Sequence, residues 1–338
     1  MTRTKLIVAT THIDRQFTQI SKEALEDAAD QVNRGSRPLL TVEHDPTLPP
    51  FGKGVKASVE PRDDGHHQLV VEHEVFDEVL WTDLPDGTKL FRQESATDKL
   101  PFSDSYSALT DDSFISFDPV NFGTQSDSVA FIDDIKRDSN VEFSIGSSGR
   151  KSLIPDPELL IGITKTIAGY LLAKKILEKT ADKVLDLAAD DLAKFYTFMR
   201  AVITSAVSYM TPKGRPITYI FVLRTDPRIE FIARSADANL VMSAMTLERL
   251  ESALSQASFY RSTLGAVRIQ YLLNTNGEWE FNYLLTGTGA VIGTEKSLSR
   301  RAKAFELLGQ DTSANPASAE KSLALSVSAS EDSLGKTR

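Results

Sequence analysis

Two tight-turn signals, one near each end of the chain, constrain the fold more than any other feature. Asp64-Gly65 lies between the alternating stretches GVKASVE and HHQLVVEHEVF, and Asn276-Gly277 lies between AVRIQYLLNT and EWEFNYLLTG. Asp-Gly and Asn-Gly favour the positive backbone angles that a two-residue hairpin turn requires. Both halves of the chain are therefore predicted to contain antiparallel strands.

Helical patterns accompany these strands. The stretch SKEALEDAADQVN has a serine at the N-cap position and apolar residues at helical spacing, and a Leu/Ala-rich pattern continues to about residue 209. A compact pattern follows, with the strands ITYIFVLRT and RIEFIARS and one helix over NLVMSAMTLERLESALSQA. We therefore predict an α+β protein.

Changes in composition divide the chain into four predicted parts. Residues 1–163 form a β-rich domain, interrupted at about 81–138 by a long insertion rich in Asp, Ser and Pro with one or two strands. Residues 164–210 form a helical segment, and residues 211–310 form a smaller α/β domain for recognition or assembly. The small and polar residues of 311–338 predict a disordered tail.

Composition excludes several classes of function. The 338-residue chain has no cysteine, which excludes disulfides, thiolate metal sites and a cysteine nucleophile. Its net charge of −9 argues against broad nucleic-acid binding. No apolar stretch has the length of a signal peptide or a spanning helix, so a cytoplasmic protein without a membrane span is predicted. The stretch GTGAVIG lacks the helix and the acidic residue of a dinucleotide site, and no cofactor is predicted.

One histidine stands where the chain stiffens. His44 ends the predicted strand RPLLTVEH, in which alternation places it on the same side as Leu40 and Val42. Prolines and a Gly-Lys turn follow. This position suits a histidine whose ring must be held in place, although an isolated histidine at a strand end is more often structural than catalytic.

One serine has a similar setting in VEFSIG, residues 141–146. Val141, Phe143 and Ile145 share one face, which is expected in the core. Ser144 then points to the opposite face beside Gly146, where a backbone can approach closely. Such a serine suits a nucleophile if an imidazole accepts its proton, although serines are also common beside strand glycines.

These stretches resemble, in the same order, those of the prohead maturation serine proteases of tailed phages, which are relatives of the herpesvirus assemblins. The resemblance covers about residues 5–163, through HIDRQFTQISKEAL, LLTVEHDPTLPPFGKGVKA, DDGHHQLVVEHEVF, FSIG and PELLIGI. It implies an assemblin-like barrel and a serine endopeptidase, with His44 as the base and Ser144 as the nucleophile. It also implies an oxyanion loop at Gly149 and Arg150.

The resemblance implies an acidic residue in the Leu-rich strand as the third member of a triad. The simplest alignment places Ile161 there, and Glu158, three positions earlier, is the candidate; a His–Ser dyad stays open. The implied partner is the chain itself or a capsid-like protein, within a homo-oligomer. The alternative is a non-catalytic assembly or interaction protein that keeps the protease-like fold.

A metal site is the remaining alternative at the histidines. His73 is placed to face His44 across the hairpin, with Glu43 as an acidic ligand. No recognised ligand spacing supports this group, so no metal is predicted.

Overall fold

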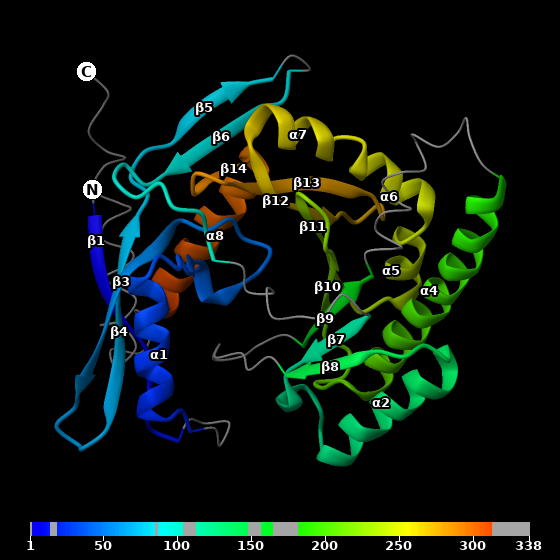
Figure 1. The fold of residues 1–338 in the computed structure, drawn as a ribbon, viewed down its shortest axis with the longest axis horizontal. Helices are drawn as coiled ribbons and strands as arrows, with labels where there is room; N and C mark the ends of the chain where they lie inside the picture. The colour runs from blue at the N-terminus through cyan, green and yellow to red at the C-terminus, as the bar shows by residue number, and fades with distance from the viewer. Residues whose placement is uncertain are drawn as a thin grey trace. The chain divides into compact units, whose positions relative to one another are not determined.

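A computed structural model describes residues 2–13, 19–84, 87–103, 113–147, 157–164 and 182–312, with only the backbone described for 182–191 and 309–312. The chain forms two compact units (Figure 1). Unit 1 comprises Met1–Asp104 and Leu285–Arg338, and unit 2 comprises Ser105–Leu284. The fold mixes helices and strands, with a β-rich N-terminal region, which confirms the predicted α+β class. The predicted boundaries at residues 163 and 210 fall inside unit 2.

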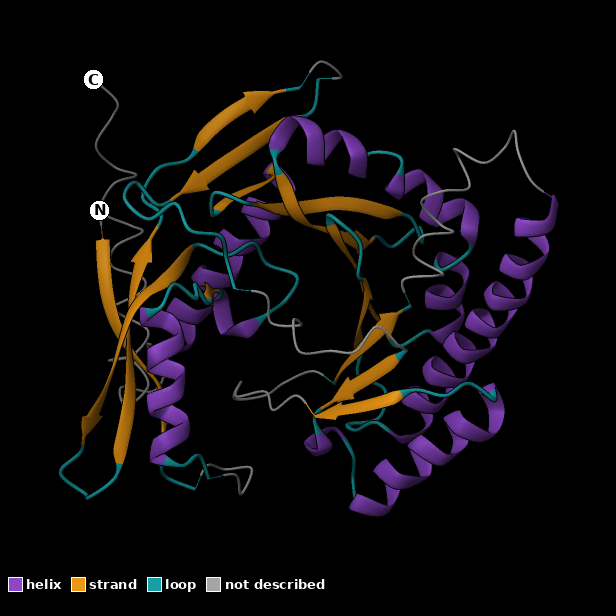
Figure 2. Cartoon of the chain, viewed as in Figure 1, coloured by secondary structure: helices purple, strands orange, loops and turns teal. Residues whose placement is uncertain are grey.

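Unit 1 contains a four-stranded antiparallel sheet in the order β1-β4-β3-β2. Its elements are β1 (Thr2–Thr10), α1 (Lys22–Asn33), β2 (Leu39–Leu40), the one-turn helix η1 (Val42–His44), β3 (Gly52–Pro61) and β4 (His67–Val75). The predicted hairpin joins β3 to β4, and Gly65 at its tip has φ 82°. Figure 2 shows α1 lying along these two strands.

Helix α1 forms where the sequence predicts it. The Ser21 side chain accepts a hydrogen bond from the Ala24 N–H, which caps the first turn. Its apolar face packs on the sheet and buries six residues together: Leu25, Ala29, Val32, Ala57, Leu69 and Val71.

Unit 1 also contains three strands that pair antiparallel in the order β5-β6-β14. They are β5 (Leu80–Asp83), β6 (Lys89–Glu94) and β14 (Ala290–Thr294), and the helix α8 (Glu295–Thr312) follows β14 directly. Strand β6 lies within the predicted insertion, and it is an interior strand whose Leu90 and Phe91 are buried.

Unit 2 is built around strands in the order β13-β12-β11-β10-β9-β7-β8. They are β7 (Phe114–Phe117), β8 (Ser144–Ser147), β9 (Glu158–Ile163), β10 (Ile217–Leu223), β11 (Arg228–Ser235), β12 (Ala266–Leu273) and β13 (Trp279–Thr286). Its helices are η2 (Pro119–Asn121), α2 (Gln125–Ser139), α4 (Asp182–Tyr209), α5 (Ala238–Ala244), α6 (Leu247–Leu254) and α7 (Ala257–Leu264). The stretch 239–257, predicted as a single helix, is therefore two short helices, α5 and α6, and α7 begins at its last residue. Among the helices in the described ranges, none combines the length and apolar character needed to cross a lipid bilayer.

The predicted insertion also contains the helix α2. Helix α2 begins at a capping box. The Thr124 side chain accepts a hydrogen bond from the Asp127 N–H, and the Asp127 side chain accepts one from the Thr124 N–H. Its Phe131 and Ile135 are fully buried, and it lies beside α4 (Figure 1). The insertion, predicted to contain one or two strands, therefore also contains a helix, because the apolar residues at i and i+4 are surrounded in the sequence by Asp and Ser.

Two buried tyrosines of the unit 2 core provide a matched test of hydroxyl burial. Tyr219 and Tyr271 are both fully buried. The Tyr271 hydroxyl donates to the Ala253 carbonyl at 2.8 Å, whereas the Tyr219 hydroxyl has no hydrogen-bond partner among the described residues. We expect Tyr271→Phe to lower the free energy of unfolding by about 1 kcal/mol, and Tyr219→Phe to leave it unchanged or raise it by up to about 1 kcal/mol. Urea denaturation of both variants checks this, and equal losses would contradict it.

Candidate active site

His44 lies in a turn and not at the end of a strand. Strand β2 ends at Leu40, and η1 follows, with Glu43 at φ 48° and His44 at φ 56°. Leu40 and Val42 are buried, whereas His44 is exposed. The predicted shared face was wrong, because side chains alternate regularly only while the backbone stays extended.

The turn that carries His44 is over-determined by its surroundings. The Asp45 N–H donates to the Val42 carbonyl at 2.9 Å, and an Asp45 carboxylate oxygen accepts from the Thr47 N–H at 2.8 Å. Leu48 and the two prolines after it are buried. Non-glycine residues in the left-handed region cost on the order of 1–3 kcal/mol each, and such positions persist only where the surrounding structure holds them.

The Gly-Lys pair opens strand β3, so the predicted turn at this point was wrong. A Cβ at Gly52 would lie 2.5 Å from the Glu74 carbonyl oxygen on the neighbouring strand. At Gly54 it would meet Pro38 at 2.8 Å. Glycine is therefore required here for close approach of backbones, and Lys53 between the two points into a buried position.

Ser144 is the first residue of β8, which pairs with β7 at the end of the described strand order in unit 2. Its N–H donates to the Ser113 carbonyl at 3.0 Å, and the residue is exposed. A Cβ at Gly146 would lie 3.1 Å from the Ser116 hydroxyl, so the neighbouring strand does approach this glycine closely. The predicted strand, with its exposed serine beside a glycine, is present.

The residues around Ser144 are less buried than expected. Val141 and Phe143 precede the strand and are half-buried, although the Phe143 ring does contact Phe198 at 5.5 Å between centroids. Ile145 is 46% exposed. The predicted core position of Ile145 was wrong, because β8 is an edge strand.

Glu158 opens strand β9, which β7 separates from β8. Phe114 of β7 lies opposite Ser144 on one side and opposite Gly162 on the other. Glu158 is four residues before Gly162 on β9, about 13 Å along the strand at about 3.3 Å per residue. The sheet therefore does not bring Glu158 beside Ser144, and both belong to unit 2 whereas His44 belongs to unit 1.

The remaining predicted sites have simpler outcomes. Gly149 and Arg150 lie outside the described residues. Among the described side chains, no group of three or more His, Asp or Glu could hold a metal ion. His73, the weak metal candidate, is buried with its Nδ1 3.1 Å from the Val71 carbonyl oxygen, and burial lowers its pKa.

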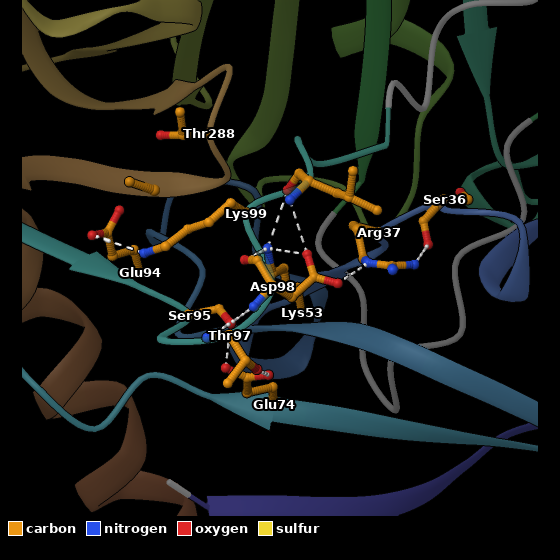
Figure 3. Close-up of polar contacts among 12 residues, drawn as sticks. Ser36, Arg37, Lys53, Glu74, Glu94, Ser95, Thr97, Asp98, Lys99 and Thr288 are labelled. Carbon is orange, nitrogen blue, oxygen red and sulfur yellow. Dashed lines mark hydrogen bonds and ion pairs between the residues drawn. The ribbon is translucent and has the colours of Figure 1, made fainter.

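Sequence reasoning missed a buried charge cluster in unit 1, which we call the Lys53 cluster: Arg37, Lys53, Glu74, Ser95 and Asp98 (Figure 3). The Lys53 side chain is fully buried, and its Nζ is 2.8 Å from an Asp98 carboxylate oxygen. It also donates to the carbonyls of Asp98 at 2.6 Å and of Leu100 at 3.1 Å. The three N–H donors of Lys53 thus have three acceptors, so hydrogen bonds fix the position of the buried ammonium group.

Three further hydrogen bonds complete the Lys53 cluster. Arg37 Nε donates to the other Asp98 carboxylate oxygen at 2.6 Å. The Ser95 hydroxyl donates to the Glu74 carboxylate and accepts from the Asp98 N–H at 2.7 Å. Burial alone would raise the pKa of Asp98, but the hydrogen bonds from Lys53 and Arg37 outweigh it and leave that pKa lowered. The cluster fixes the segment after β6 onto β3 and β4.

Unit 2 has a buried charge network of its own. Glu230 is fully buried, with one carboxylate oxygen 2.7 Å from Arg268 and the other 3.3 Å from Arg228. Arg228 lies on β11, an interior strand between β10 and β12. Burial lowers the pKa of Arg228 to about 10, so its guanidinium stays charged at neutral pH.

The described structure is thus an α+β protein with an exposed serine on an edge strand and a histidine in a constrained turn. No protein-family model, curated protein or solved structure matches the chain.

Proposed function

We propose that this protein is a serine endopeptidase resembling the prohead maturation proteases, with an assemblin-like barrel, in which His44 and Ser144 act as a dyad. The observation that carries the proposal is the backbone at Glu43 and His44, where two consecutive non-glycine residues occupy the left-handed region. Strained backbone positions of this kind cluster at active sites, where they hold a side chain in the orientation that the reaction needs.

The setting of Ser144 supports the same proposal. Its hydroxyl belongs to an exposed residue, and a backbone hydrogen bond to Ser113 holds its N–H. In the proposed reaction His44 takes the hydroxyl proton while the serine oxygen attacks a peptide carbonyl carbon. The proton then passes to the leaving amine, and water hydrolyses the acyl-enzyme. The substrate is the chain itself or a protein partner in an assembly, and the dyad assigns no step to Glu158.

Labelling with a fluorophosphonate probe tests this function. We expect the wild type to be labelled at Ser144 and Ser144→Ala to lose labelling by about a thousandfold or more, because the nucleophile is absent. His44→Gln should slow labelling by about a hundredfold or more through loss of the base. Ser58→Ala, at an exposed serine of β3, is the matched control and should label like the wild type. Undiminished labelling of Ser144→Ala, or no labelling of any form, would show that the assignment is wrong.

A second candidate is an assembly protein without catalysis. Exposed apolar side chains on two edge strands favour it: Leu80 is 53% exposed and Trp81 41% exposed on β5, and Ile145 is 46% exposed on β8. Edge strands with such side chains can pair with a further chain. A wild type that self-associates in sedimentation but is never labelled would favour this candidate.

A further inference from the structure

Helix α8 packs against the turn that carries His44. The Phe51 ring, just after the turn, meets the Phe305 ring of α8 edge-on, with centroids 4.9 Å apart. Other apolar residues extend this contact on both sides: Leu40, Val42, Leu48, Ala304 and Leu308. All of these residues belong to unit 1. The turn is therefore packed onto a helix from a distant part of the sequence.

Arg301 of α8 adds a polar attachment to this packing. Its Nη1 donates to the Pro50 carbonyl at 2.8 Å and lies 3.4 Å from the Pro49 carbonyl oxygen, and its Nη2 donates to Gln93 at 2.5 Å. The residue is 6% exposed. A buried guanidinium needs acceptors, and buried carbonyls of a proline pair need a donor, so the interaction satisfies both sides.

Arg301 remains charged although it is buried. Burial lowers its pKa to about 10, so the guanidinium remains protonated at neutral pH. Its central carbon lies 5.9 Å from the centroid of the Phe91 ring, which provides a further favourable contact for a cation. Arg301 is thus a charged group that contacts neutral backbone carbonyls, a side-chain amide and an aromatic ring. Its planar guanidinium donates to the Pro50 carbonyl and to the Gln93 amide oxygen at the same time.

The contacts with α8 add distant support to the hydrogen bonds that the turn makes within itself. Arg301 is 251 residues from Pro50 in the sequence. Within the turn, backbone hydrogen bonds run from the Asp45 N–H to the Val42 carbonyl and from the Leu48 N–H to the Asp45 carbonyl. Two residues in left-handed conformation add a cost that packing must offset.

We propose that Arg301 is a positioning residue for His44, and that α8 clamps the turn so that the imidazole is presented in one orientation. The catalytic consequence rests on the proposed function, whereas the clamp itself does not. Activity would then require that α8 be docked, which makes the site sensitive to changes far from it in the sequence.

Amide hydrogen exchange and probe labelling on the full chain separate the two parts of this proposal. The variants are Arg301→Met, which keeps length without hydrogen bonds, and Arg301→Lys, which keeps the charge and one donor group. Lys303→Met, at an exposed position of the same helix, is the control. We expect Arg301→Met to speed exchange of the Asp45 and Leu48 amides by about tenfold, with the β3–β4 amides unchanged.

The labelling of Ser144 should slow in parallel. A shift of about 1 Å in a catalytic group costs up to about a hundredfold in rate, so we expect a slowing of about tenfold to a hundredfold in Arg301→Met and an intermediate rate in Arg301→Lys. If Arg301→Met does not fold, Arg301→Lys carries the same comparison.

Hydrogen exchange tests whether α8 clamps the turn, and probe labelling tests whether Arg301 positions His44. Unchanged exchange in the turn overturns the clamp, and faster exchange with unchanged labelling overturns the positioning role. A general rise in exchange across β3 and β4 would also overturn it, since that indicates only lost stability. If the wild type is not labelled, the proposed function fails, and the exchange data alone decide whether α8 clamps the turn.

Discussion

Asp98→Asn is expected to lower the free energy of unfolding by about 3–5 kcal/mol, because it removes one partner of a buried ion pair. Lys53 is fully buried, and its ammonium would keep only carbonyl and amide acceptors. Arg37, whose side chain is 10% exposed, would lose its carboxylate partner as well. Urea denaturation at pH 7 measures the loss as a lower midpoint with an unchanged slope.

Asp83→Asn is the matched control, because Asp83 is an exposed carboxylate on β5 of the same unit. A surface change of this kind should stay within about 0.5 kcal/mol of the wild type. If Asp98→Asn were equally mild, the Lys53 cluster would not contribute to stability as we describe.

The effect of Asp98→Asn on the free energy of unfolding should depend on pH. The pKa of Asp98 is lowered in the folded protein, so below its unfolded value of about 3.9 the unfolded chain binds more protons. The contribution of Asp98 is therefore complete above that value and is lost as the pH falls through the folded pKa. The difference in the free energy of unfolding between wild type and Asp98→Asn should be constant from pH 7 to about pH 4 and narrow as the pH falls further, and a difference that does not change on acidification would contradict the assignment.

Gly162→Ala is the second change with a large expected effect. A Cβ at Gly162 would lie 1.8 Å from Cε1 and 2.0 Å from Cδ1 of the Phe114 ring, which covers this glycine across the strand pair. Phe114 is 1% exposed and packs with Leu160 and Ile220, so its ring has no room to move aside. We expect a loss of about 3 kcal/mol or more, at the upper end of overpacking, measurable by thermal or urea unfolding.

A double-mutant cycle provides the control for this clash. Phe114→Leu removes the ring and should have its own cost, but in that background the added methyl at Gly162 should cost much less than in the wild type. Coupling of about 1 kcal/mol or more is expected for groups in direct contact. Strict additivity would show that the methyl acts somewhere other than on Phe114.

Local signals in the sequence predicted several elements correctly. The Ser21 cap and apolar spacing predicted α1, and the Asp64-Gly65 turn predicted the β3–β4 hairpin. The Leu/Ala-rich pattern that runs to about residue 209 predicted the helix that ends at Tyr209. Each of these signals acts over a few residues, so it can be read without knowing what the segment packs against.

The candidate site was predicted unevenly. Ser144 was placed on a strand beside a glycine, as observed, whereas His44 was placed in a strand that ends four residues before it. Alternation through Leu40 and Val42 continued too far because nothing in the local pattern marks left-handed residues at Glu43 and His44. The packing of α8 and the hydrogen bonds of Arg301 hold that turn, and these come from 251 residues away.

By itself, the sequence determined the α+β class, the hairpins, α1 and the helix that ends at Tyr209, because periodicity and turn residues act through neighbouring backbone. Only the tertiary structure decided which charges are buried together, as at Lys53 and Asp98, and which strands lie at an edge, as β8 does. The reason is physical: burial and ion pairing depend on groups that meet across the fold, and their energies arise only once those groups have left water.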